Sequence, residues 1–200
     1  MFFVTLEEAA KNGDLTMVKW LCDVRGEWSP YAAVLAASGG HLDVLKWLRG
    51  NIFSSSPSAS MDDAAANGHL HVLKWLQINS GYATPAAMNK AAGNGHLDIV
   101  KWLHKTRREG CTITAMDTAA ANGHLEIVKC ERSEGCTAKA FVNATTADEL
   151  EILQWLFEHY RDQFGHDRLQ LFALGKFYTL QWLKQESILE DLPESERHFE

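Results

Sequence analysis

Apolar residues recur every three or four positions in several segments of this chain, a spacing typical of amphipathic helices. The segment 97–103 shows the pattern best, with apolar side chains at Leu97, Ile99, Val100, Trp102 and Leu103. Asp98 and Lys101 fall on the opposite side of the predicted helix, three residues apart, where they can form an ion pair. Asp43 with Lys46, and Glu126 with Lys129, repeat this arrangement. The pattern therefore predicts a series of helices with one apolar face and one charged outer face.

A second, smaller helix is predicted before each amphipathic one. It is rich in alanine, as in the segment 115–121, and small side chains allow neighbouring helices to approach closely. Its start is marked by a capping hydroxyl followed by proline, a combination that suits the first turn of a helix. The starts are Ser29-Pro30, Ser56-Pro57 and Thr84-Pro85, and Thr112 and Thr137 take the same place without proline. Asn-Gly pairs between the two helices predict tight corners, because both residues tolerate positive φ.

The two-helix phrase recurs at a fixed period. Its copies end at Trp20, Trp47, Trp75, Trp102, Cys130, Trp155 and Trp182, at intervals of 27, 28, 27, 28, 25 and 27 residues. A period of this size predicts a repeat array of about seven stacked units in one elongated domain. The predicted units are 1–26, 27–54, 55–82, 83–110, 111–135, 136–162 and 163–185. Residues 186–200 are polar and acidic, and we expect them to form a frayed tail.

One copy, at 111–135, is damaged. Three residues are missing after Val128, and Cys130 stands where the other copies have tryptophan. A buried tryptophan replaced by so small a side chain costs about 3–5 kcal/mol if a cavity remains. The sequence therefore predicts the weakest seam near 130–134. After this copy, Thr146-Ala-Asp-Glu149 predicts a capping box for the next helix.

Composition and charge narrow the class of protein. Net charge is −7, but residues 1–140 carry 14 basic and 14 acidic residues, so the excess lies wholly in 141–200. A neutral body with an acidic end argues against a nucleic-acid binder. No apolar run approaches the ~18 residues that cross a membrane, and the first residues do not resemble a secretory signal. The cysteines (Cys22, Cys111, Cys130 and Cys136) lack metal-site spacing, so we expect free thiols and an intracellular, cytoplasmic protein.

Three residue types recur at the same place in successive repeats and could be mistaken for binding sites: histidine, tryptophan and lysine. The histidines His41, His69, His96 and His124 lie one repeat apart, hence roughly 10 Å apart for packed helices, too far for one metal ion. We interpret them as structural. The tryptophans are interpreted as core between repeats, and the lysines as an outer face with acidic partners. The lysines are Lys19, Lys46, Lys74, Lys101 and Lys129.

No catalytic arrangement of residues stands outside the repeat register. The chain has no glycine-rich phosphate loop, no nucleophile elbow, and no Cys–His or paired-carboxylate pattern. We therefore predict a protein that is not an enzyme, with no cofactor, no metal and no small-molecule substrate.

The phrase Ala-Ala-x-Asn-Gly-His-Leu resembles the core of the ankyrin repeat. It is seen at 64–76, 91–103 and 119–129, and weaker copies end at Trp20 and Trp47. The resemblance implies an all-α solenoid of helix–turn–helix units. The ankyrin repeat usually has about 33 residues, so this is a shortened form whose linkers are too short for full β-hairpin fingers. The histidine that usually starts the first helix is replaced by Asp62, Asn89 and Asp117.

The resemblance further implies a protein–protein interaction scaffold that binds through the concave face formed by its first helices. Paired positions there change chemistry between repeats. The pairs are Glu7/Glu8, Val34/Leu35, Asp62/Asp63, Asn89/Lys90 and Asp117/Thr118. We predict that the last three pairs bind a partner protein, and Arg107 and Arg108 form a second candidate patch. Plain surface drift is the competing interpretation of this variation.

Three other functions remain open from the sequence. The array could be an adaptor or effector module that recruits a target to other machinery. It could be a fragment, or a drifting repeat copy, without a dedicated partner. The least favoured alternative is a nucleic-acid or acidic-surface binder that uses the lysine column.

The damaged copy yields a first testable prediction. Amide hydrogen exchange in 130–134 should be faster than in the intact linker 105–111, because the copy has lost most of a helical turn. Exchange measured by mass spectrometry on peptic fragments checks this. Equal or slower exchange in 130–134 would contradict the predicted weak seam.

Overall fold

The computed structural model describes residues 4–51, 57–79, 83–106, 112–130, 136–160, 179, 181 and 182. It divides into two compact bodies, the amino-terminal body Met1–Thr112 and the carboxy-terminal body Ile113–Glu200. The described residues form twelve α-helices and no strand, so the predicted all-α class is confirmed. None of these helices is long and apolar enough to cross a membrane.

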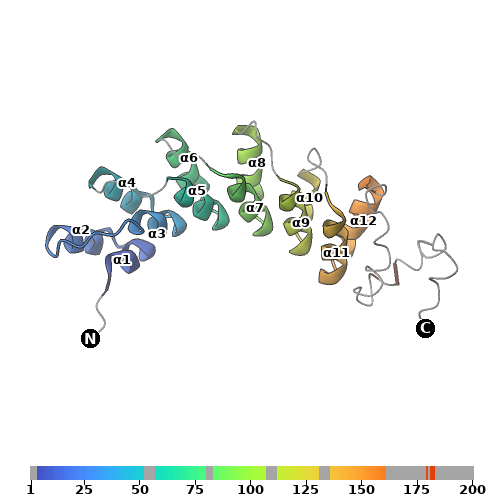
Figure 1. Ribbon diagram of the computed structural model, residues 1–200, viewed down its shortest axis with the longest axis horizontal. Coiled ribbons are helices and arrows are strands. Elements are labelled where there is room, and N and C mark those ends of the chain that lie inside the picture. The colour runs from blue at the N-terminus through green and yellow to red at the C-terminus, as the bar shows by residue number, and fades with distance from the viewer. Residues whose placement is uncertain are drawn as a thin grey trace. The chain divides into compact units, whose positions relative to one another are not determined.

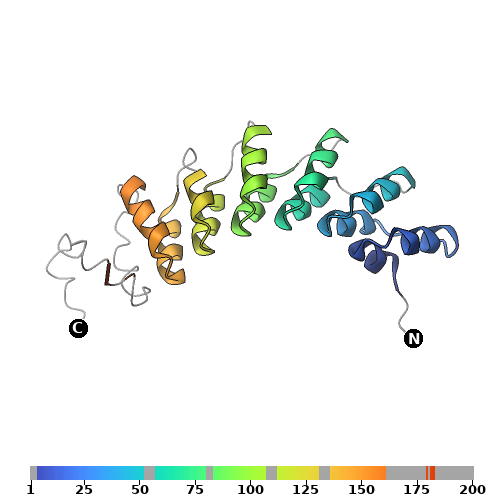
Figure 2. The same ribbon diagram turned by 180° about the vertical axis from the view of Figure 1, so that it is seen from behind.

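The amino-terminal body is built from four helix pairs in two layers (Figure 1). The first-helix layer consists of α1 (Leu6–Asn12), α3 (Ala32–Ser38), α5 (Pro57–Ala66) and α7 (Pro85–Gly93), which lie side by side. The second-helix layer consists of α2 (Leu15–Asp23), α4 (Leu42–Asn51), α6 (Leu70–Ile78) and α8 (Leu97–Thr106). Each second helix packs against the first helix that precedes it, and Figure 2 shows the same two layers from behind.

The carboxy-terminal body repeats this arrangement. The first helices α9 (Ile113–Ala121) and α11 (Ala138–Ala147) pack against each other. The second helices α10 (Leu125–Cys130) and α12 (Leu150–Tyr160) each pack on their own first helix. The candidate surface positions of the first helices are therefore presented in the same way in both bodies.

Alanine faces bring the first helices together. Both alanines of each pair are fully buried in α3, α5 and α7; they are Ala36, Ala37, Ala64, Ala65, Ala91 and Ala92. Interaxial distances of 8–10 Å depend on the side chains at the contact, and alanine permits the short end of that range. The prediction that alanine pairs allow close approach is thus confirmed for these helices.

The tryptophan prediction is wrong. The core contributed by the second helices consists of aliphatic side chains, such as Val72, Leu73 and Leu76 in α6. Trp20 is 48% exposed, and the other described tryptophans that end a repeat copy (Trp47, Trp75, Trp102, Trp155 and Trp182) are half-buried. The aliphatic residues already fill the space beneath each helix, so the broader indole lies at its margin.

The helix corners form as predicted. Gly13 ends α1 at φ 76°, in the left-handed region, and its N–H donates to the carbonyls of Ala9 and Ala10. A Cβ at Gly13 would also overlap the ring of His41 from the next repeat. Glycine is thus required there by backbone conformation and by the approach of the neighbouring repeat.

Helix starts agree with the prediction in part. Thr84 caps α7 by accepting from the N–H of Ala86, and Thr137 caps α11 by accepting from Lys139. Ser29 accepts from the N–H of Tyr31, but α3 begins only at Ala32. The capping box is wrong, because Thr146 lies inside α11 and its hydroxyl donates to the Val142 carbonyl.

The damaged copy has a short second helix. α10 has 6 residues, whereas α8 has 10. Cys130 is half-buried, as is Trp102 at the equivalent position, so the cost expected from an emptied tryptophan pocket does not apply. Residues 131–134 of the predicted weak seam lie outside the described residues, as do most of 163–185 and the whole of 186–200. The linker 24–31 contains no strand, and the other linkers fall largely outside the described residues.

The corner after α11 provides a second prediction. Asp148 takes the place of the corner glycine at φ 67°, and its Oδ1 is buried without a hydrogen-bond partner. Asp148→Gly should stabilise the carboxy-terminal body by about 1 kcal/mol, because it removes the left-handed strain and the unsatisfied oxygen. Thermal unfolding followed by circular dichroism measures the change.

Gly123→Ala supplies the opposite control for this measurement. Gly123 has φ 78°, and an added Cβ would lie 2.6 Å from Oε1 of Glu149. This variant should melt at a lower temperature. A lower melting temperature for Asp148→Gly would contradict the account of this corner.

Candidate functional site

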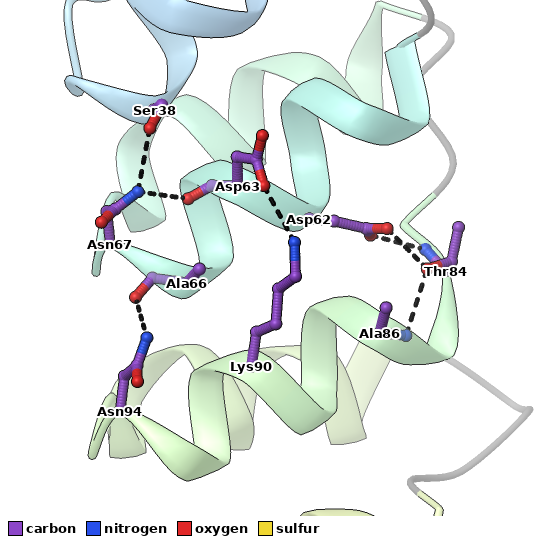
Figure 3. A network of polar contacts seen from close by, with 9 residues as sticks. All are labelled: Ser38, Asp62, Asp63, Ala66, Asn67, Thr84, Ala86, Lys90 and Asn94. Atoms are coloured by element: carbon purple, nitrogen blue, oxygen red, sulfur yellow. Dashed lines mark hydrogen bonds and ion pairs between the residues drawn. The ribbon is translucent and has the colours of Figure 1, made fainter.

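The first position of four of the five candidate pairs is a link to the next repeat: Glu7, Asp62, Asn89 and Asp117. In α5, Oδ1 of Asp62 accepts from the N–H of Thr84 at 3.0 Å, and Oδ2 accepts from its hydroxyl at 2.6 Å (Figure 3). The same hydroxyl accepts from the N–H of Ala86 at the start of α7. The carboxylate therefore holds the capping residue of the neighbouring repeat in place. We call this arrangement the inter-repeat clamp.

The clamp recurs with different chemistry. In the carboxy-terminal body, Asp117 accepts from the N–H of Thr137 at 3.2 Å and from its hydroxyl at 2.7 Å. In the amino-terminal body, Glu7 accepts from the Ser29 hydroxyl and Asn89 accepts from the Thr112 hydroxyl. Val34 takes this place in α3, and its side chain cannot accept a hydrogen bond.

The clamp around Asp117 is the most enclosed of these. Asp117 is 7% exposed, and its carbonyl accepts from the amide of Asn143 on α11. Burial, with the nearby Asp117 carboxylate, raises the pKa of the Cys136 thiol to about 12. That thiol is therefore neutral at physiological pH and is a packing residue rather than a nucleophile. Cys22 is a free, buried cysteine.

Asparagine and histidine side chains also join repeats. Asn94 donates its amide to the Ala66 carbonyl at 2.7 Å, and His96 donates from Nε2 to the same carbonyl at 3.1 Å. His41 donates to the Lys11 carbonyl at 3.0 Å. Burial lowers the pKa of His69, which keeps its ring neutral at physiological pH. The interpretation of these histidines as structural is confirmed for His41 and His96.

The second position of each pair has no such role in the clamp. We call these the variable positions: Glu8, Leu35, Asp63 and Lys90 in the amino-terminal body and Thr118 in the carboxy-terminal body. Nζ of Lys90 lies 2.9 Å from Oδ1 of Asp63, and both side chains are substantially exposed (Figure 3). The Thr118 hydroxyl donates to the Thr114 carbonyl within its own helix. Arg107 and Arg108 lie outside the described residues.

The sequence shows the candidate pairs directly, but it shows the clamp only as a spacing between an acceptor and a capping hydroxyl. That spacing is 22 residues from Asp62 to Thr84 and 23 from Asn89 to Thr112. From Asp117 to Thr137 it is 20, because the damaged copy lacks three residues. The acceptor and the capping residue each have an ordinary local explanation, so the sequence alone does not show that they bond to each other.

Adjacent aspartates on α5 provide a third prediction. Asp62→Ala should destabilise the amino-terminal body by about 1–3 kcal/mol, because it leaves the Thr84 N–H and hydroxyl without their acceptor. Asp63→Ala is the matched control and should cost less than about 1 kcal/mol, since it removes only an exposed ion pair. Urea unfolding followed by circular dichroism compares the two. Equal losses would show that the clamp contributes nothing beyond surface charge.

Comparisons with known proteins agree with this architecture. Residues 61–131 match the family model described as ankyrin repeats (3 copies). The crystal structure of the human ASB11 ankyrin repeat domain aligns with a TM-score of 0.66 and 16% sequence identity, covering 94% of this chain and 98% of that chain. At that identity the likeness concerns the fold alone. A search of curated proteins found no match. Residues 61–131 of the chain therefore match ankyrin repeats, within an array whose repeat is mostly shortened to 27–28 residues.

Proposed function

We propose that the chain is a non-catalytic scaffold that binds a partner protein through the variable positions of its first helices. Ankyrin repeats are generally protein–protein interaction modules. The observation that supports this surface is the division within each pair. The first position is used to join repeats, whereas the second differs in every repeat of the amino-terminal body: Glu8, Leu35, Asp63 and Lys90.

The clamps favour such a role because they fix the backbone beneath the variable positions. A surface that is already ordered loses little conformational entropy on association, which leaves more of the contact energy for affinity. The Asp63–Lys90 ion pair crosses from α5 to α7 at 2.9 Å, so it offers a partner both charges at a fixed separation. A partner with a complementary charge pair fits this part of the layer.

An aromatic side chain lies beside the variable positions. Tyr31 is 66% exposed and lies directly before α3, where its carbonyl accepts from the N–H of Leu35 one turn further on. Tyrosine is enriched among the residues that dominate binding energy in protein interfaces. We propose Tyr31 as an apolar anchor flanked by the charged variable positions. Tyr31 is not among the partner-binding residues that the sequence predicts.

The compartment follows from the thiols. Cys22 is free and buried, and burial raises the pKa of its thiol. A free thiol of this kind fits a reducing compartment, so we propose an intracellular, cytoplasmic location.

The fourth prediction tests the first-helix surface. Immobilised protein should retain a partner from a cell extract, and Asp63→Lys should weaken capture of that identified partner at least tenfold. Asp63 is the better choice for charge reversal than Asp62 or Asp117, whose carboxylates maintain clamps. Affinity is then measured by calorimetry with the purified partner, and the helical circular dichroism signal should be unchanged.

A matched control reverses the same charge on the other layer. Asp43 is exposed on α4, so Asp43→Lys makes an identical change in charge away from the variable positions. It should leave capture intact. Unchanged affinity for Asp63→Lys and for Tyr31→Ala would reject the first-helix surface as the binding site.

A further inference from the structure

The two layers of the amino-terminal body carry opposite charge. The first helices contain four acidic and two basic residues, a net charge of −2. The second helices contain six basic and three acidic residues, a net charge of +3. The net charge of zero for residues 1–140 hides this separation, because it adds the two layers, the linkers and part of the carboxy-terminal body together.

The lysines of the second-helix layer lie at the surface. Lys19, Lys46, Lys74 and Lys101 are exposed, and none of them forms an ion pair with any residue that the structure describes. α6 carries Lys74 without any acidic residue. The sequence-based expectation that acidic partners balance the lysine column is therefore wrong in this body. It holds in the carboxy-terminal body, where Lys129 lies 2.9 Å from Glu126.

Aromatic surface accompanies these cations. Each lysine is followed directly by a tryptophan, and Trp20 is 48% exposed while Trp47, Trp75 and Trp102 are half-buried. The Arg49 guanidinium lies over the Trp75 ring, 5.6 Å from its centroid, so α4 and α6 are linked through a further cation at this face. Aromatic side chains partly exclude water from the charged groups beside them, and this strengthens ion pairs that form there.

We propose that the second-helix layer of the amino-terminal body, marked by Lys19, Lys46, Lys74 and Lys101, docks an extended acidic segment of a protein partner. The first helices of successive repeats pack side by side, at the roughly 10 Å usual for packed helices, and we take this distance as the approximate step from one lysine to the next. An extended chain rises about 3.3 Å per residue, so an acidic side chain at every third residue matches that step. A segment of roughly ten to twelve residues spans the four lysines.

Charge distribution favours an acidic peptide over a nucleic acid. A long polyanion interacts with the whole molecule, whose net charge is −7, and is repelled by it. A short acidic segment can align with the one positive layer and avoid the negative one. This surface is separate from the variable positions, so the two proposals succeed or fail independently.

The fifth prediction uses a fluorescein-labelled peptide with glutamate at every third residue, twelve residues long, as the probe. Titrated into the full chain at low salt, it should bind and change the intrinsic tryptophan fluorescence. Lys74→Glu with Lys101→Glu should weaken binding at least tenfold. The slope of log affinity against log salt concentration should also become less steep. Both lysines are exposed and form no ion pair with a described residue, so the helical signal and melting temperature should be retained.

The control is Lys11→Glu with Lys90→Glu, which lowers net charge by the same amount in the first-helix layer. It should change peptide affinity less than twofold. Equal losses for the two double variants, or no binding by the unaltered chain, would overturn the proposal. Displacement of the peptide by a thymidine oligonucleotide that binds more tightly would also overturn it, and would indicate a nucleic-acid surface instead.

Discussion

Close packing between the alanine faces of successive first helices is the contact on which the other inter-repeat interactions depend. Ala64, Ala65, Ala91 and Ala92 are fully buried, so α5 and α7 approach within reach of short polar side chains. Only at such a separation can Asp62 accept two hydrogen bonds from Thr84, and Asn94 reach the Ala66 carbonyl. Larger side chains in the alanine positions would separate the helices and break these bonds together.

The clamp explains how one helix can be both scaffold and proposed binding surface. Adjacent residues on a helix point about 100° apart, so Asp62 turns toward the next repeat while Asp63 stays accessible. The same division separates Asn89 from Lys90. A residue that varies between repeats is therefore not automatically a recognition residue. Asp62, Asn89 and Asp117 vary in chemistry, yet each is an acceptor for a hydroxyl of the following repeat.

The two layers of the amino-terminal body differ in net charge and in whether their charged side chains have bonding partners. Carboxylates of the first helices are engaged, as in Asp62 with Thr84 and Asp63 with Lys90. Lysines of the second helices are exposed and have no ion-pair partner among the described residues. Such a molecule can offer two chemically different surfaces on opposite layers of one body, an arrangement suited to holding two protein segments at once.

The sequence by itself determined the helices, their pairing and the period, because these depend on local signals. Helical spacing of apolar residues, Asn-Gly corners and capping threonines such as Thr84 and Thr137 act within a few residues. It also identified the ankyrin repeat and the helix faces on which candidate residues lie. The tertiary structure alone decided which of two neighbouring residues faces the next repeat, and which lysines lack a counterion. It also decided that tryptophan lies at the margin of the core. Each of those outcomes depends on atoms brought together across one repeat, some 20–30 residues apart in the chain, by helix packing that no local pattern records.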